Sequence, residues 1–283
     1  MNVLPRLFLN LLQRIKRIND HSQSLLIIMR PYTWAMSFGD LLSRIVDGMN
    51  RILNWRNLKL VSIDSVPGYH RFRVLPPIAT VIDVGVGHEG SPFLYQSFPD
   101  AFFISIDPLR ECQKAVERHL PMERSVFVET ALGSEESSIT IGVASMPSMT
   151  SILQRKNDDE LSQAIEMREV PVRCLDEVIE TVMDGRLIER PVFLKVDTEG
   201  YEMEVLKGAE KTLQLADYVM LETPLAEHVQ GSYSLEEAVA FMDSQGFSVF
   251  QIIDAAVDLV DLLYVRKDDP IRETYVYGRR KGA

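Results

Sequence analysis

The sequence predicts an α/β fold in which a doubly wound sheet is closed by a C-terminal antiparallel hairpin and preceded by a helical N-terminal extension. From residue 78 onward, short apolar runs alternate with helical segments, which is typical of buried parallel strands joined by helices. Near the end of the chain two strand-like runs follow each other closely, which indicates a hairpin. We therefore expect the extension at residues 1–60, the sheet domain at 61–270 and a frayed tail at 271–283.

The N-terminal extension is basic and amphipathic. Apolar residues recur at helical spacing over residues 7–18 and again over residues 41–53. Residues 1–59 contain nine Lys or Arg but only three Asp or Glu, although the whole chain has a net charge of −11. Such helices either pack on the sheet domain or on a second copy of the chain, or they lie on a membrane surface. The extension therefore predicts a homo-oligomer or a membrane-surface contact.

The sheet domain contains a regular succession of elements. Ser234 and Glu237 form a capping box, which opens a helix that ends before Gly246 and buries Leu235, Ala238, Val239 and Met242. The spacing of the apolar residues predicts helices over 111–119 and 202–215, strands over 78–84, 102–106, 126–128, 192–196 and 218–221, and hairpin strands over 247–253 and 259–265.

Composition and charge exclude several classes of protein. The acidic balance argues against nucleic-acid binding. Two cysteines, Cys112 and Cys174, cannot build a disulfide framework or a four-cysteine zinc site. The longest apolar run near the N-terminus, Leu25–Met29, is too short to span a membrane, and no signal-peptide order is present. We expect a cytoplasmic protein that is peripheral to a membrane at most.

Residues 81–90, VIDVGVGHEG, predict a cofactor loop. Gly85, Gly87 and Gly90 follow a strand and precede a helix in the pattern G-x-G-x-x-G, which nucleotide-binding domains of several kinds share. Asp83 ends the strand, and together with Glu89 it would repel the pyrophosphate of a dinucleotide. The ammonium and sulfonium groups of S-adenosylmethionine would instead be favoured there. The alternative is that Asp83 only caps a turn.

Two further residues belong to this predicted cofactor site. His88 lies inside the loop, where it either contacts a ligand or faces solvent. Asp107 ends the second strand, where a carboxylate accepts hydrogen bonds from the ribose hydroxyls of either cofactor.

A second group of polar residues follows the strand at 192–196. Phe193, Lys195 and Asp197 share one face of that strand, so Lys195 requires a counter-charge from Asp197 or from Glu222 on the next strand. Asp197, Glu199 and Glu222 then gather at the carboxyl edge of the sheet. They form either a catalytic cluster or a buried ion pair with a helix cap.

The motifs together resemble the FkbM family of methyltransferases. The resemblance covers about residues 78–266, and FLKVDTEGYEMEVLKGAE is its most specific part. It implies a Rossmann-like methyltransferase fold, S-adenosylmethionine as cofactor, and a hydroxyl acceptor on a sugar, glycolipid or polyketide. It also adds Ala131 and Leu132, in the motif ETALGS, to the cofactor-binding residues. The sequence departs from the family pattern at Asp107-Pro108, where many members have Glu-Pro, and at Val86-Gly87.

A hydroxyl acceptor needs a general base, which contributes roughly 10²–10⁴-fold to the rate. Asp197 or Glu199 is the predicted base, with Lys195 fixing the carboxylate, and Glu222, His88 and His228 are the other candidates. Asp197, Glu199 and Glu222 together have oxygens that suit Mg²⁺. Because Lys195 competes for these carboxylates, we expect no metal.

Two other functions stay open from the sequence. One is a nicotinamide-dependent oxidoreductase, and the other is a non-catalytic scaffold that docks through its N-terminal helices. The segments 142–170 and 223–234 are the predicted acceptor-specificity loops. The expected acceptor is a small molecule, a glycan or a glycolipid.

Overall fold

The computed structural model describes residues 26–29, 59–62, 72–144, 164–225, 232–256, 258–276 and 279–280. The chain divides into two compact units, residues 1–70 and residues 71–283. The sequence analysis placed this boundary at residue 60.

In the first unit, β1 (Leu26–Met29) pairs in parallel with β2 (Lys59–Ser62). These residues are strand where the sequence analysis expects a helical extension, in keeping with the β-branched residues at their centres. The amphipathic helices predicted over 7–18 and 41–53 lie outside the described residues.

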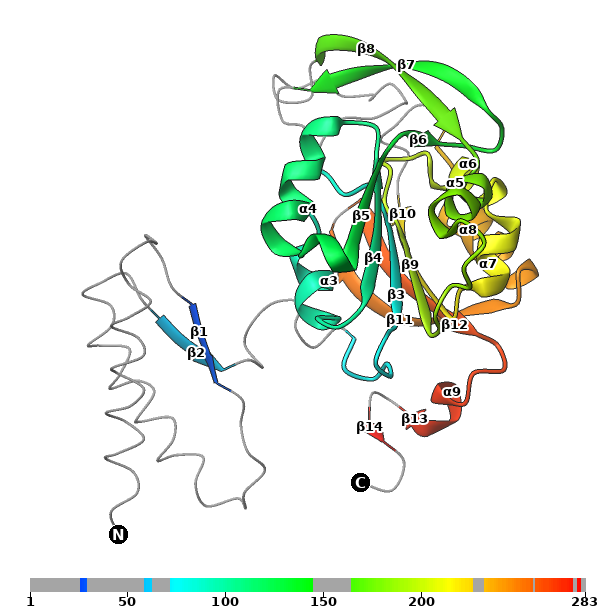
Figure 1. The fold of residues 1–283 in the computed structure, drawn as a ribbon. Coiled ribbons are helices and arrows are strands. Elements are labelled where there is room, and N and C mark those ends of the chain that lie inside the picture. Colours follow the sequence, from blue (N-terminus) through cyan, green and yellow to red (C-terminus); the bar gives the residue numbers. More distant parts are fainter. Residues whose placement is uncertain are drawn as a thin grey trace, which may run out of the picture. The chain divides into compact units, whose positions relative to one another are not determined.

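The second unit is built on a seven-stranded sheet in the order β11-β12-β10-β9-β3-β4-β5 (Figure 1). Strands β5, β4, β3, β9 and β10 are parallel, and β12 is antiparallel to both β10 and β11. The predicted doubly wound sheet and its closing hairpin are therefore confirmed. The strands are β3 (Thr80–Val84), β4 (Phe102–Asp107), β5 (Ser125–Glu129), β9 (Val192–Val196), β10 (Tyr218–Pro224), β11 (Phe247–Ala255) and β12 (Leu259–Arg266).

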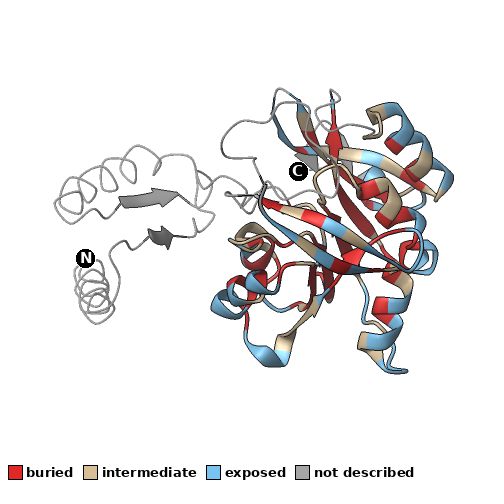
Figure 2. Ribbon diagram, turned by 90° about the horizontal axis from the view of Figure 1, so that it is seen from above, coloured by how far each residue is buried: buried red, intermediate tan, exposed pale blue. Residues whose placement is uncertain are grey.

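Helices cover both faces of this sheet. On one face, α3 (Pro92–Ser97) and α4 (Gln113–His119) pack on a cluster that contains Val81 and Phe103 (Figure 1). On the other face, four helices pack on Ile82 and Ile104, which alternate with the first pair along the same strands. Buried residues follow the strands in Figure 2, and exposed ones lie on the outer sides of the helices. The four helices are α5 (Leu175–Met183), α6 (Glu202–Lys207), α7 (Glu210–Leu215) and α8 (Leu235–Ser244).

Two helix predictions differ in detail from the structure. The helix predicted over 202–215 is broken between α6 and α7 at Gly208 and Ala209. A Cβ on Gly208 would lie 2.1 Å from the carbonyl oxygen of Gly133, so the close approach of the two backbones requires glycine at this position. The helix predicted over 111–119 begins as a 3₁₀ turn, η3 (Arg110–Cys112), before α4.

The capping box that opens α8 is confirmed, since the Ser234 side chain accepts from the Glu237 N–H while the Glu237 carboxylate accepts from the Ser234 N–H. Val239, which was expected in the buried stripe of this helix, is exposed, and Ala238 and Met242 are buried as expected. A second 3₁₀ turn, η4 (Met122–Arg124), leads into β5.

A small second sheet, the β-arm, was not expected from the sequence. It consists of β6 (Ala131–Leu132), β8 (Ala164–Arg173) and β7 (Ser137–Ala144), in that order, and lies beyond the carboxyl ends of β4 and β5 (Figure 1). Ile141 and Val172 of the β-arm pack on Leu109 and Cys112. Arg168 also forms an ion pair with Glu111, so the β-arm is tied to η3. Part of the predicted specificity loop 142–170 is therefore strand.

The last described residues form α9 (Ile271–Thr274) and the short strands β13 (Tyr275–Val276) and β14 (Arg279–Arg280), which pair with each other. The tail predicted to be frayed is thus ordered in part. None of the helices in the described ranges has both the length and the apolar character needed to cross a membrane.

Candidate functional site

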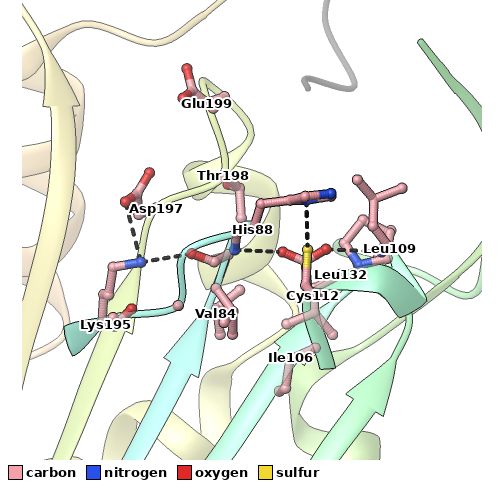
Figure 3. Close-up of a pocket in the computed structure, with 18 of the residues that line it drawn as sticks. Val84, His88, Ile106, Leu109, Cys112, Leu132, Lys195, Asp197, Thr198 and Glu199 are labelled. Carbon is pink, nitrogen blue, oxygen red and sulfur yellow. Dashed lines mark hydrogen bonds and ion pairs between the residues drawn. The ribbon is translucent and has the colours of Figure 1, made fainter. Parts of the chain in front are cut away.

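A cavity of about 510 Å³ opens at the carboxyl edge of β3, β4, β9 and β10 (Figure 3). Its volume lies within the range of small-molecule sites in proteins. Among the described residues, the cavity brings together all but one of the predicted site residues, Asp83 being the exception. The predicted residues on its wall are Gly85, Gly87, His88, Gly90, Asp107, Ala131, Leu132, Lys195, Asp197, Glu199 and Glu222.

The cofactor loop depends on glycines for its shape. Gly85, Gly87 and Gly90 have φ values of +76°, +67° and +74°, a region that disfavours other residues. A Cβ on Gly85 would lie 1.7 Å from the carbonyl oxygen of Asp197, so the loop touches the chain after β9. A Cβ on Gly87 would meet no atom within 4 Å. Gly87 therefore leaves open space on the cavity wall for a ligand to approach the backbone.

Asp107 presents a well-oriented carboxylate to the cavity. Its Oδ2 accepts a hydrogen bond from the Gly87 N–H at 2.9 Å, and its Oδ1 accepts one from the Leu109 N–H at 2.8 Å. Burial raises the pKa of this carboxyl group, and the two backbone N–H groups oppose that shift. The Cys112 side chain also hydrogen-bonds to this carboxyl group. This arrangement fits the paired hydroxyls of a ribose.

Asp83 does not line the cavity. It is fully buried beneath the loop, and its Oδ1 lies 3.4 Å from Nζ of Lys195, its directly opposed neighbour on β9. Burial raises the pKa of Asp83, while the ammonium of Lys195 opposes the shift. The sequence argument treated Asp83 as an unpaired charge that attracts a cationic ligand. The structure instead places Lys195 beside it, so any influence of Asp83 on a ligand passes through Lys195.

Lys195 joins three parts of the site. Its Nζ donates to the carbonyl oxygen of Gly85 at 2.7 Å, and it lies 3.2 Å from Oδ2 of Asp197 as well as close to Asp83. Burial lowers the pKa of Lys195, but the carboxylates of Asp197 and Asp83 outweigh burial and raise it above its ordinary value. Lys195 therefore stays charged and links the cofactor loop to the chain after β9.

We refer to residues 197–200 as the acid turn. The Asp197 side chain is about one-third exposed (33%), while its partner Lys195 is buried. Glu199 and Gly200 have φ values of +56° and +104°, and Glu199 is thus a non-glycine residue in the left-handed region. Figure 3 shows Glu199 at the tip of the turn, with its carboxyl group directed away from Lys195.

Glu222, on β10, lies near the acid turn and is largely buried. Burial, with additional repulsion from Asp197 and Glu199, raises its pKa to about 10. The Tyr233 hydroxyl donates to the carbonyl oxygen of Glu222 at 2.5 Å and so holds the end of β10. This shift favours the protonated form of Glu222, in which the side chain is a hydrogen-bond donor.

Glu202, Cys112 and Ile141 are among the residues in or behind the cavity wall that were not identified from the sequence. Glu202, buried behind the acid turn, accepts hydrogen bonds from Thr198 and Gly200. An acidic residue at the start of a helix, in an otherwise apolar stripe, is the sequence feature that could have indicated this hydrogen-bonding role. Cys112 and Ile141 line the cavity, and Sγ of Cys112 lies 3.6 Å from Nδ1 of His88. Ile141 belongs to the unexpected β-arm, which no motif indicated.

Two points of the sequence analysis remain, namely His228 and a metal site. His228 lies outside the described residues. Within the described part of the chain, no group of three or more His, Cys, Asp or Glu residues is placed to hold a metal ion.

Comparisons with known proteins identify a family model and a relative that match this chain. The model of the Methyltransferase FkbM domain matches residues 83–249. Methyltransferase sdnD of Sordaria araneosa is 24% identical over 223 residues, which are 69% of this chain and 84% of that protein.

Two solved structures resemble the chain at lower identity. The magnesium protoporphyrin IX methyltransferase of Synechocystis PCC 6803, solved with bound SAM, is 12% identical with a TM-score of 0.38, covering 83% of this chain and 87% of that one. The precorrin-6y C5,15-methyltransferase of Geobacter metallireducens GS-15 is 11% identical with a TM-score of 0.39, covering 71% and 86%.

Proposed function

The chain belongs to the FkbM methyltransferase family, and we propose on that premise that it methylates a hydroxyl group of a sugar, a glycolipid or a polyketide-type metabolite. Its methyl donor is S-adenosylmethionine. The observation that carries the proposal is Asp197, a partly exposed carboxylate on the cavity wall that the buried Lys195 orients.

The residues of the cavity suit the methyl donor. Asp107 offers two oriented oxygens to the ribose hydroxyls, and the open side of Gly87 leaves the backbone accessible to the methionine part. Ala131, Leu132 and Leu109 supply an apolar wall for the adenine ring of the methyl donor. When bound, S-adenosylmethionine supplies an electrophilic methyl group and a neutral thioether as leaving group.

Asp197 is the proposed general base. An aliphatic hydroxyl is a weak nucleophile, so the proton must leave the acceptor oxygen as the new carbon–oxygen bond forms. Asp197 Oδ1 receives that proton, because Lys195 occupies the neighbourhood of Oδ2. Glu222, which is protonated at neutral pH, donates a hydrogen bond to the acceptor. Holding the two reactants in place accounts for roughly 7–11 kcal/mol of the barrier.

Binding tests the donor first. S-adenosylhomocysteine should raise the melting temperature of the protein, and NAD should not. A response to NAD alone would revive the nicotinamide-dependent oxidoreductase. Binding of S-adenosylhomocysteine without any methyl transfer would favour the non-catalytic scaffold.

Transfer tests the acceptor and the base. Labelled S-adenosylmethionine is incubated with the protein and a cell extract, and the labelled product is identified by mass analysis. Asp197→Asn should lower kcat at least 10²-fold while the Kd for S-adenosylhomocysteine stays within threefold. Asp243→Asn is the matched control, because Asp243 pairs with Lys267 on the surface, away from the cavity. An Asp197→Asn variant that turns over like the wild type removes Asp197 as base, and label on nitrogen or carbon refutes O-methylation.

A further inference from the structure

Glu202, at the start of α6, is a buried acid that the proposed chemistry does not use. The residue is 1% exposed, although it carries a carboxyl group. It is not on the cavity wall, which is formed by Asp197, Thr198 and Glu199 in front of it. A buried carboxyl group without a metal or a cationic partner is costly unless it is hydrogen-bonded. Its partners therefore indicate why it is there.

A single oxygen of Glu202 binds the acid turn at three points. Oε1 accepts hydrogen bonds from the Thr198 N–H at 2.7 Å, from the Gly200 N–H at 3.1 Å and from the Thr198 hydroxyl at 3.2 Å. These donors flank Glu199 on both sides. The carboxyl group of Glu202 thus holds the backbone before and after Glu199.

The acid turn needs such support because its backbone is strained. Glu199 has a φ of +56° and Gly200 a φ of +104°, so two successive residues lie in the left-handed region. A residue with a side chain persists in that region only where its surroundings impose it. Glu202 accepts hydrogen bonds from the backbone N–H groups on both sides of Glu199. The backbone conformation of the acid turn therefore determines where Asp197 and Glu199 lie on the cavity wall.

We propose that Glu202 is the positioning residue of the acid turn: through Thr198 and Gly200 it holds Asp197 and Glu199 where the acceptor hydroxyl is deprotonated. The inference rests on the proposed function. The role requires an acceptor atom at Oε1 and does not require a negative charge. Glutamine preserves this atom, whereas methionine, of similar length, removes it.

The chain contains a matched control. Asp176, on α5, accepts hydrogen bonds from the Lys211 N–H, the Thr212 N–H and the Thr212 hydroxyl. It therefore holds the first turn of α7 with the same set of donors, namely two backbone N–H groups and one threonine hydroxyl. Asp176 does not line the cavity. Asp176→Leu and Asp176→Asn repeat the two substitutions at a site that has only a structural role.

The experiment compares Glu202→Met, Glu202→Gln, Asp176→Leu and Asp176→Asn in the full chain. The probes are S-adenosylhomocysteine for binding, and labelled S-adenosylmethionine with the extract fraction that the wild-type protein methylates. Glu202→Met should lower kcat at least 30-fold with the Kd for S-adenosylhomocysteine within threefold, and Glu202→Gln should restore kcat to within fivefold of the wild type. Asp176→Leu should lower the melting temperature and leave kcat within twofold.

Hydrogen exchange gives a second readout that needs no acceptor. The Thr198 and Gly200 amides should exchange at least tenfold faster in Glu202→Met than in the wild type, and not in Glu202→Gln. If Glu202→Met does not fold, Thr198→Val takes its place, because it removes only the hydroxyl bond and should lower kcat by about threefold to tenfold.

Three results would overturn the proposal: a Glu202→Met variant with wild-type kcat, a Glu202→Gln variant as impaired as Glu202→Met, or an equal loss of kcat in Asp176→Leu. Each of them leaves the proposed function intact, because the wild-type protein still methylates the extract. A wild-type protein that binds S-adenosylhomocysteine but transfers no methyl group refutes the proposed function, and this proposal with it.

Discussion

Replacing Glu222 with glutamine should stabilise the protein at neutral pH. Burial and the neighbouring carboxylates of Asp197 and Glu199 raise the pKa of Glu222 to about 10, whereas the ordinary value is 4.5. The folded-state pKa is above the unfolded-state value, so the contribution of Glu222 to stability is fully present below about pH 4.5 and declines as the pH rises towards 10. Glutamine resembles the protonated form and shows no such decline.

The size of the effect follows from this shift. Each pH unit between the two pKa values changes the free energy of unfolding by about 1.4 kcal/mol. At pH 7, 2.5 units above the unfolded-state value, Glu222→Gln should therefore be more stable than the wild type by about 3 kcal/mol.

Urea unfolding of both proteins at pH 5, 6, 7 and 8 measures the difference directly. The gain in stability should grow with pH by about 1.4 kcal/mol per unit. Glu236→Gln, on the exposed side of α8, is the control and should show no pH-dependent gain. A gain for Glu222→Gln that stays constant from pH 5 to pH 8, or that is absent, refutes the conclusion that Glu222 is protonated and with it the donor role proposed here.

Three other substitutions test the walls of the cavity. Gly85→Ala should abolish binding of S-adenosylhomocysteine in isothermal titration and lower the melting temperature, because the new Cβ would overlap the carbonyl oxygen of Asp197 at 1.7 Å; normal binding would contradict the loop geometry. Asp107→Asn should weaken the Kd for S-adenosylhomocysteine by about tenfold to a hundredfold, since the amide nitrogen cannot accept a hydrogen bond, and an unchanged Kd would remove Asp107 from the ribose site. Lys195→Met should lower the free energy of unfolding in urea by about 3–5 kcal/mol, because it leaves the buried Asp83 without its partner. A loss below about 1 kcal/mol would show that Asp83 is neutral in the fold.

The central sheet could be predicted because each of its strands carries a local signal. The buried runs of β3, β4 and β9 are short and mostly apolar, and a glycine or an acid marks the end of each. The β-arm has no such signal. Strand β8 contains Glu166, Arg168 and Glu169 among its apolar residues and pairs with β7 across 19 or more intervening residues, so its partner is visible only in three dimensions.

Most residues of the candidate site could be predicted from the sequence, but the ion pairs and hydrogen bonds between them could not. The predicted doubly wound sheet indicated that Asp197, Glu199 and Glu222 meet at one edge, since the carboxyl ends of parallel strands lie together, and all three line the cavity. Sequence cannot assign the partner of Lys195 when two acids lie within reach. In the structure Nζ of Lys195 lies 3.2 Å from Asp197, one of the two predicted partners, and 3.4 Å from Asp83, which is directly opposed to Lys195 on β3. Asp83, which the sequence analysis expected at the ligand, lies beside Lys195 and not on the cavity wall.

The distribution of charge around Lys195 separates the cavity into two functional halves. Lys195 donates a hydrogen bond to Gly85 in the cofactor loop and forms an ion pair with Asp197 in the acid turn. One buried cation therefore fixes both the loop proposed to bind the methyl donor and the proposed general base. Asp83 and Asp197 together hold the charge on Lys195 despite its burial. Glu222 completes the balance by keeping its proton, since a third ionised carboxylate here would be repelled by Asp197 and Glu199. A protonated acid beside an ionised one is the arrangement that lets a single wall both donate a hydrogen bond to an acceptor and remove its proton.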